Sequence, residues 1–202
     1  MIDVVLIHPG APRAVYGELA EQFTAIEPPV WARMIAGWLI SNGARVLLID
    51  QEADNLSCAQ VSERVEQLNP KLVGVIAVGH QPSASTQQMK AARDLCNELH
   101  GNYKVVIIGH HVSALPERTL REEHVHYACD GEGPLTLLGL LRGDSLDKIP
   151  GLVWWCGKES GVIRKNPPAP LIPIDELHGD VWDQLPMQNY RSHNWQVFDN
   201  LE

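Results

Sequence analysis

Short runs of apolar, mostly β-branched residues alternate along the first two thirds of the chain with longer segments in which apolar residues recur every three or four positions. The short runs are typical of strands buried on both faces, and the longer segments have the period of helices that pack on one side. The runs that predict strands are Val4–Ile7, Arg45–Ile49, Leu72–Val78, Val105–Ile108 and Val125–Cys129. This alternation predicts five β/α units that form a doubly wound, five-stranded parallel sheet.

Capping and breaking residues mark where the intervening helices begin and end. The first helix follows Pro28-Pro29 and ends at Asn42-Gly43, because glycine readily adopts the left-handed conformation that closes a helix. Ser57 is expected to cap the second helix, which continues to Leu68. The other helices are expected over Ser85–His100, from near Leu115-Pro116-Glu117 onward, and over Pro134–Leu141.

The pattern changes after Gly143. Two apolar runs, Gly151–Trp155 and Gly161–Arg164, flank a turn-rich segment and predict a β-hairpin. The run Asn166–Pro170 is rich in proline, which donates no backbone hydrogen bond, so it is excluded from a core sheet and predicts an extended linker or arm. We therefore expect residues 1–145 to form the α/β domain, 146–166 the hairpin, and 167–202 an extended proline-rich tail that serves as a linker.

Composition narrows the classes of partner. The chain has 202 residues, a formal net charge of -9 and no cluster of Lys and Arg, which argues against a nucleic-acid surface or an anionic membrane as partner. The N-terminus has no basic leader and no apolar stretch of spanning length, so we expect a cytoplasmic protein. The four cysteines lie far apart, with no C-x-x-C pair, and predict neither a zinc knuckle nor a disulfide framework.

Candidate chemistry lies where the predicted strands end, because open parallel sheets bind ligands outside the carboxyl ends of their strands. The stretch from Lys104 to Gly133 is the most informative part. Its aliphatic strand ends in Gly109-His110-His111, and the next strand ends in Asp130-Gly131-Glu132-Gly133. Glycines at such ends let the backbone approach a ligand closely.

Several pieces of sequence that occur in order along the chain carry a resemblance to a known family. They are Val-Leu-Ile-His-Pro near the start, Glu27-Pro28-Pro29, Asn42–Asp50, Ile107-Ile108-Gly109 with Leu115-Pro116-Glu117, and Asp130–Pro134. Together they resemble the cobalamin-binding domain that precedes the radical S-adenosylmethionine core of corrinoid-dependent methyltransferases and of the anaerobic magnesium-protoporphyrin monomethyl ester oxidative cyclase. Ile149–Val153 and Ile174–Leu177 resemble the bridge between those two domains.

The resemblance implies a flavodoxin- or Rossmann-like sheet that binds cobalamin, with the corrin ring over the strand ends and the nucleotide tail in the crevice. The candidate cofactor-binding residues lie in the loops after the strands. They are His8, Pro9, Gly10, Gly79, Ser83, Ser85, Thr86, Gly109, His110, His111, Gly131, Glu132 and Gly133. The hydroxyls of Ser83, Ser85 and Thr86 fit ordinary helix caps equally well.

Two departures from the family pattern bear on the site. Cobalamin domains that ligate cobalt through histidine carry Asp-x-His-x-x-Gly after the first strand, whereas here His8 precedes Pro9-Gly10. Base-off cobalamin without a histidine ligand from that motif is therefore implied, and His8 is interpreted as structural. His110 stands where many members have a second glycine, so its side chain would either crowd the nucleotide tail or hydrogen-bond to it.

The other chemistry-bearing residues favour no catalytic or metal site. His110, His111, His124 and His126 cluster in the sequence, but their spacing matches no standard zinc pattern, so surface or capping roles are favoured. Glu132 has no acid, base or nucleophile paired with it by spacing, and a role in loop geometry or ligand binding is expected.

The family's next element would be a C-x-x-x-C-x-x-C loop that holds a [4Fe-4S] cluster and cleaves S-adenosylmethionine. None of the four cysteines has that spacing, so this chain is expected to bind the corrinoid without starting radical chemistry itself. We expect the cluster and S-adenosylmethionine in a missing C-terminal radical SAM domain of the same parent, which would carry out methyl transfer or oxidative cyclisation. We interpret Leu201-Glu202 as a remnant of cloning at the point where a longer parent protein was truncated.

Two alternatives stay open from the residues. A flavodoxin-like domain that binds a flavin or nucleotide would need a phosphate-binding loop after the first strand, and His8–Pro12 is a poor one. A partner domain that has lost its cofactor is the other alternative, and His110 in place of glycine is its best support.

Overall fold

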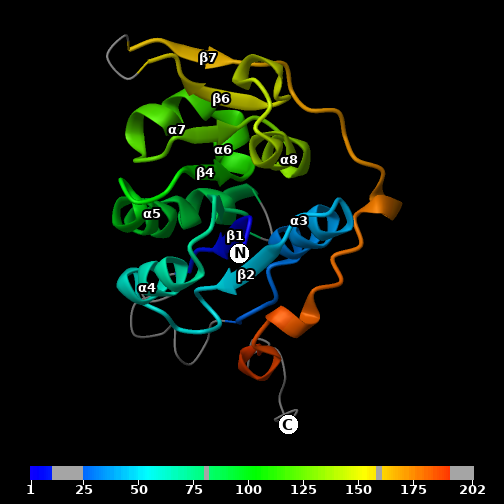
Figure 1. The fold of residues 1–202 in the computed structure, drawn as a ribbon. Helices are drawn as coiled ribbons and strands as arrows, with labels where there is room; N and C mark the ends of the chain where they lie inside the picture. Colours follow the sequence, from blue (N-terminus) through cyan, green and yellow to red (C-terminus); the bar gives the residue numbers. More distant parts are fainter. Residues whose placement is uncertain (11–24, 80–81, 158–160, 192–202) are drawn as a thin grey trace.

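The computed structural model describes residues 1–10, 25–79, 82–157 and 161–191 and contains one seven-stranded sheet in the order β2-β1-β3-β4-β5-β6-β7 (Figure 1). The first five strands of this sheet are mutually parallel, and the last two are antiparallel to their neighbours. The strands are β1 (Val4–His8), β2 (Val46–Asp50), β3 (Leu72–Ile76), β4 (Val105–Ile108), β5 (Tyr127–Cys129), β6 (Leu152–Trp155) and β7 (Ile163–Lys165).

Helices cover both faces of the sheet (Figure 1). On one face lie α4 (Cys58–Leu68), α5 (Pro82–Leu99), α6 (His110–Ala114) and α7 (Pro116–Glu122). On the other lie α3 (Val30–Ser41), α8 (Pro134–Arg142) and part of the C-terminal segment. With apolar layers on both sides, the parallel strands are apolar almost throughout, as strands buried on two faces must be.

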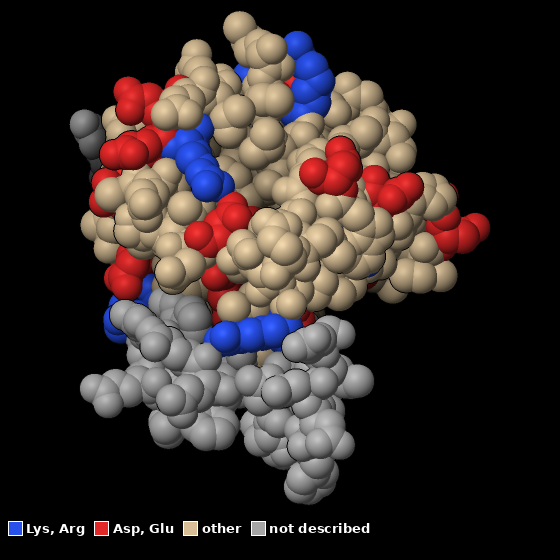
Figure 2. All heavy atoms as spheres, turned by 90° about the horizontal axis from the view of Figure 1, so that it is seen from below, with Lys and Arg blue, Asp and Glu red and all other residues tan. Residues whose placement is uncertain are grey.

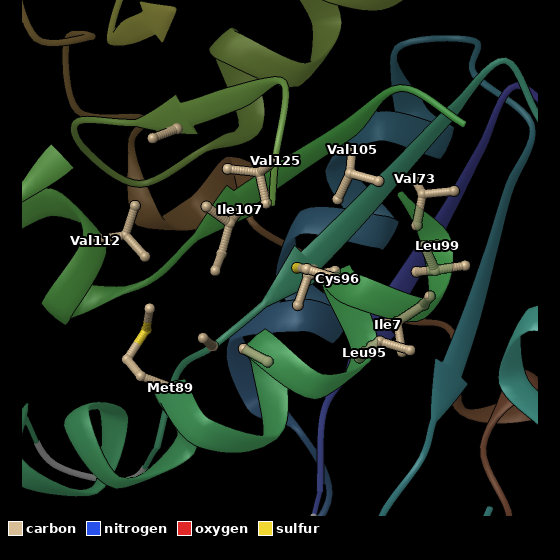
Figure 3. Close-up of a cluster of buried hydrophobic side chains, with 14 of the residues drawn as sticks. Ile7, Val73, Met89, Leu95, Cys96, Leu99, Val105, Ile107, Val112 and Val125 are labelled. Atoms are coloured by element: carbon tan, nitrogen blue, oxygen red, sulfur yellow. The ribbon is translucent and has the colours of Figure 1, made fainter. Parts of the chain in front are cut away.

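On the α5 side of the sheet, the apolar face of the helix packs against alternate residues of the strands. Met89, Leu95, Cys96 and Leu99 follow one face of α5 and point at the sheet (Figure 3). They pack against alternate residues of the strands, among them Val73, Val105 and Ile107, all completely buried. Burying side chains of this size stabilises the fold by about 2 kcal/mol each, so this layer stabilises the packing of the helices on the sheet.

The expected elements are present, with boundaries shifted by at most three residues. Ser57 caps α4 through a capping box with Gln60, and Asn69 ends that helix in the left-handed conformation. The short helix α6 was not expected, because five residues are too few to show a helical period. Gly109-His110-His111, expected as a turn, therefore runs directly into a helix.

The expectation of a five-stranded sheet is wrong, because the sheet has seven strands. β6 pairs antiparallel with β5, and β7 pairs antiparallel with β6. Without them the short β5 would be an edge with unpaired backbone groups, which proteins usually cover. The turn expected between the two runs includes residues 158–160, which lie outside the described residues.

The segment after β7 packs along the α3 face and reaches the far edge of the sheet (Figure 1). It contains three short 3-10 turns, η4 (Ile174–Glu176), η5 (Trp182–Gln184) and η6 (Met187–Asn189). Leu177, Val181 and Leu185 are buried in the core shared with α3. The expectations that concerned Leu201-Glu202 lie outside the described residues. Within the described ranges, no helix combines the length and apolarity that crossing a membrane requires.

Candidate functional site

The carboxyl ends of the parallel strands gather the predicted site residues at one edge of the sheet. β1 is followed by α3 on one face, whereas β3 is followed by α5 on the opposite face, so the connections diverge between these neighbouring strands. Such a point of divergence opens a crevice where doubly wound sheets bind ligands. The loops after β1, β3, β4 and β5 border this edge.

The loop after β1 meets the loop after β2. His8, buried at the end of β1, has its Nε2 4.0 Å from Glu52 Oε2, and Gly10 N–H donates a 3.5 Å hydrogen bond to Gln51 Oε1. Burial, with a smaller contribution from the neighbouring Asp50 carboxylate, raises the pKa of Glu52 to about 7. The contact with His8 is longer than a hydrogen bond, and a protonated Glu52 forms no ion pair with it.

Hydroxyl groups on α5 connect the loop after β3 to the helix after β4. Gly79 N–H donates to Ser85 Oγ over 2.9 Å, and the same oxygen lies 3.0 Å from His110 Nδ1. One residue further along both elements, Thr86 Oγ1 lies 3.2 Å from His111 Nδ1. Ser85 is completely buried, so its hydroxyl holds the loop and the imidazole in place. The side chain of Ser83, the third predicted hydroxyl, is outside the described part.

Glycines set how closely the backbone segments approach at this edge. A Cβ on Gly109 would lie 2.2 Å from the carbonyl oxygen of Ala77, so only glycine lets the end of β4 pass the end of β3. Gly133 has a φ of 103°, which favours glycine, and a Cβ there would lie 2.8 Å from Ile108 Cδ1. Both positions were predicted from the sequence, and the structure gives each a steric reason.

The loop between β5 and α8 is held from two sides. Gly131 N–H donates to Ser113 Oγ over 2.5 Å, and Trp31 Nε1–H donates to the carbonyl oxygen of Glu132 over 3.1 Å. In the described structure Glu132 Oε2 is buried without a hydrogen-bond partner. A buried, unpaired carboxylate oxygen is costly, and at a ligand edge it is a candidate to accept a ligand's hydrogen bond.

Ser113 and Trp31 are site residues that the sequence analysis missed. Trp31 lies in the apolar stripe of α3, which indicated core packing, and Ser113 falls in the unexpected helix α6. Their partners are distant in sequence, 101 residues for Trp31 and 18 for Ser113. Only the folded arrangement brings them to the loop.

The histidines that cluster in the sequence separate in the fold. His110 and His111 lie at the carboxyl edge, whereas His126 Nδ1 accepts the Val105 N–H at the start of β4. His126 and His124 have ring centroids 5.8 and 5.2 Å from that of His100. Across the described ranges, no group of three or more His, Cys, Asp and Glu side chains is arranged to hold a metal ion.

A separate cavity of about 380 Å³ lies at the opposite edge of the sheet, where β3 and β4 begin. Lys71, Lys104 and Tyr127 line it, together with leucines from the end of α8. Both lysines are exposed, and Lys71 Nζ lies 2.9 Å from Asp3 Oδ1. Because this cavity lies away from the predicted site, it serves as a comparison region for ligand binding at that site.

Lys and Arg side chains are spread among the acidic ones on the face drawn in Figure 2 and do not merge into a continuous basic patch there. That distribution agrees with the net charge of -9.

A family model described as the B12 binding domain matches residues 19–141. Among curated proteins, the chain is 31% identical over 170 residues to an uncharacterized methyltransferase of Pyrococcus horikoshii, covering 82% of this chain and 36% of that protein. It is 25% identical over 196 residues to the anaerobic magnesium-protoporphyrin IX monomethyl ester cyclase of Rubrivivax gelatinosus, covering 93% of this chain and 33% of that protein. The chain thus spans only a minor part of both relatives.

Solved structures share the fold. The radical S-adenosylmethionine methyltransferase TsrM of Kitasatospora setae, with cobalamin and a [4Fe-4S] cluster bound, matches with a TM-score of 0.60 and 21% identity, over 89% of this chain and 31% of that one. The cobalamin-dependent S-adenosylmethionine radical enzyme OxsB, with aqua-cobalamin bound, matches with a TM-score of 0.57 and 17% identity, over 84% of this chain and 23% of that one.

Proposed function

Because the chain belongs to the B12 binding domain family, we propose that it binds a corrinoid at the carboxyl edge of its parallel strands. In this proposal the ring lies over the strand ends, and the nucleotide tail enters the crevice where the connections of β1 and β3 diverge. The observation that carries it is the convergence of Gly79, Gly109 and Gly131 at one edge, with Glu132 Oε2 buried and unpaired beside them.

The residues at this edge fit a large, flat ligand. Among the described residues, a Cβ on Gly131 would meet no atom nearer than Ala169 N, at 4.0 Å, so a ring can approach the backbone there. The exposed imidazole of His110 and the unpaired Glu132 oxygen add polar groups near that approach. Corrinoid side chains are amides, whose N–H groups can donate to the Glu132 oxygen. The nucleotide tail carries a phosphodiester, which can accept from the imidazole.

The remaining site residues have supporting roles in the proposal. Pro9 and Gly10 form the loop after β1, and His8 packs beside Glu52 beneath them. A His8 buried at a strand end fits a structural role better than cobalt ligation, so in this proposal base-off cobalamin binds without a histidine ligand from this position. Ser85 and Thr86 position the two imidazoles, and Gly133 turns the chain into α8.

The reaction belongs to the parent protein. A bound corrinoid supplies methyl-carrying or redox chemistry. We propose that a C-terminal radical SAM domain holds the [4Fe-4S] cluster and S-adenosylmethionine, and that the parent performs methyl transfer or oxidative cyclisation. The two curated relatives, a methyltransferase and a cyclase, support this choice of reactions, and both are about three times as long as the region that this chain matches.

Titration of the purified chain with hydroxocobalamin tests the proposal. We expect the corrinoid to co-elute with the protein in gel filtration and to show a base-off visible spectrum. Flavin mononucleotide, run in parallel, is expected to elute separately. A chain that is folded by circular dichroism and retains flavin but no corrinoid would favour the flavodoxin-like alternative, and one that retains neither would favour a cofactor-free partner domain.

A further inference from the structure

His110 is an exposed imidazole fixed between two loops of the candidate site. It begins α6 directly after Gly109, at the carboxyl end of β4, and its Nδ1 lies 3.0 Å from the hydroxyl of Ser85, which belongs to the helix after β3. The ring therefore spans the gap between the ends of β3 and β4. Within the described structure, no hydrogen-bond partner is found for its other nitrogen, Nε2.

The hydrogen bonds of Ser85 determine which nitrogen of His110 carries the proton. Ser85 Oγ already accepts the N–H of Gly79, and its own hydrogen needs an acceptor because the residue is completely buried. Within the described residues, His110 Nδ1 is the acceptor in reach. If His110 donated instead, the buried hydroxyl hydrogen would stay unpaired, which costs on the order of 1–3 kcal/mol. Neutral His110 thus carries its proton on Nε2.

This arrangement makes His110 a preset hydrogen-bond donor at the carboxyl edge. Nδ1 is occupied by Ser85, so Nε2–H is the group that a ligand meets. Its complement is a hydrogen-bond acceptor that reaches the end of β3. In a corrinoid bound as proposed above, the nucleotide tail enters the crevice between β1 and β3, next to the gap that His110 spans, and offers phosphodiester oxygens and a base nitrogen as acceptors.

We propose that His110 is a specificity-determining residue that selects corrinoids with a complete nucleotide tail by donating its Nε2–H to an acceptor on that tail. This inference rests on the proposed corrinoid binding. It answers the question that the sequence left open, since an imidazole fixed by Ser85 serves as a donor to the tail and does not crowd it.

The neighbouring pair provides a matched control. His111 Nδ1 lies 3.2 Å from Thr86 Oγ1, the same kind of contact one residue along both helices. Thr86 is exposed, so water can satisfy its hydroxyl and the contact does not determine the tautomer of His111. We assign no selectivity to His111.

The test compares dissociation constants for cobalamin and for cobinamide, which lacks the nucleotide tail. His110→Asn keeps an oxygen acceptor for Ser85 but places no donor where Nε2–H lies, so it separates a structural role from ligand recognition. We expect His110→Asn and His110→Ala to weaken cobalamin binding about tenfold, as loss of one hydrogen bond predicts, and to leave cobinamide binding unchanged. His111→Ala is expected to leave the ratio of the two dissociation constants unchanged.

Equal weakening of both corrinoids in the His110 variants would overturn the inference, as would tighter cobalamin binding by His110→Gly, which would mean crowding. If the unsubstituted chain binds both corrinoids and the variants behave like it, the inference fails and corrinoid binding stands. If the unsubstituted chain binds neither, both fail. In the ligand-free protein, ¹⁵N NMR is expected to show His110 protonated at Nε2, and protonation at Nδ1 would contradict the argument.

Discussion

At the end of β2, Glu52 is a carboxylic acid in surroundings that disfavour its charge. Burial raises its pKa to about 7, from an ordinary value of 4.5, and the Asp50 carboxylate adds to the shift. Between these two values the folded protein binds more protons than the unfolded chain. The stability contributed by this group is therefore present at low pH and is lost as pH rises through about 7.

Replacing Glu52 with Gln removes this titration. We expect the free energy of unfolding of the variant to fall less than that of the original chain, by about 3 kcal/mol, as pH rises from 4.5 to well above 7. Urea denaturation across that range measures it. Glu63→Gln, at an exposed position on α4, is the control and should leave the pH profile unchanged. Parallel profiles for Glu52→Gln and the original chain would refute the assignment.

Among the elements, an ion pair ties α5 to the end of α7. Arg93 donates from Nε and Nη2 to the two carboxylate oxygens of Glu123, over 2.9 and 2.7 Å, and the Glu123 side chain is only 3% exposed. The carboxylate raises the pKa of Arg93 through this hydrogen bonding. Two parallel bonds of this kind fix orientation as well as distance.

Truncating Arg93 to Ala leaves the Glu123 carboxylate without its partner. Because the Arg93 side chain is 48% exposed, water reaches the carboxylate in part, and we expect a loss of about 2 kcal/mol in the free energy of unfolding, measured by urea denaturation. Arg121→Ala is the control, because Arg121 pairs with Glu117 on the exposed surface of α7 and such pairs contribute less than about 1 kcal/mol. Equal losses in the two variants would show that pairing with the buried Glu123 carboxylate contributes no more than a surface pair.

Local sequence predicts those parts of the fold that depend on local physics. Ser57 and Leu68 were identified as the boundaries of α4 because capping acts over a few residues. The five parallel strands were recognised because burial on both faces leaves continuous apolar runs. The pairing of β6 with β5 was not predicted, because an apolar run does not indicate which other strand it will pair with.

The same division applies to the candidate site. Gly109 and Gly133 were predicted as glycines that let a ligand approach the backbone, and that role stays a prediction. The structure gives another reason for them, since a Cβ at either position would clash with the protein itself. The pairing of Ser85 with His110 could not be predicted, because it depends on how α5 meets α6 across the sheet edge. The contact of Trp31 with the Glu132 carbonyl depends likewise on how α3 packs.

On the scale of the whole molecule, the C-terminal segment closes the β2 edge of the sheet. Leu48 N–H donates to Gln184 Oε1 over 2.8 Å, and Gln184 Nε2 lies 3.4 Å from the Val46 carbonyl. This one side chain thus makes the kind of backbone hydrogen bonds that a neighbouring strand would make with β2. The Tyr190 hydroxyl donates to Asp50 Oδ2 over 2.9 Å, next to the carboxyl edge. Burial, and then the Asp50 carboxylate, raise the pKa of Tyr190.

Replacing Gln184 with Ala should uncover this edge. We expect faster hydrogen exchange at the Leu48 amide and a loss of about 1 kcal/mol in the free energy of unfolding, since one amide loses its partner. Gln188→Ala, an exposed position in the same segment, is the matched control and should change neither. Unchanged exchange at Leu48 in Gln184→Ala would mean that the segment does not protect the β2 edge.

Hydrogen exchange with and without hydroxocobalamin tests most directly whether the carboxyl edge of the sheet binds a corrinoid. We expect slower exchange in the loops after β1, β3, β4 and β5, including Gly79, Gly109 and Gly131. The cavity near Lys71 and Lys104, at the opposite edge, should show no change. Protection at that cavity without protection at the carboxyl edge, or no protection anywhere in the folded chain, would contradict the account.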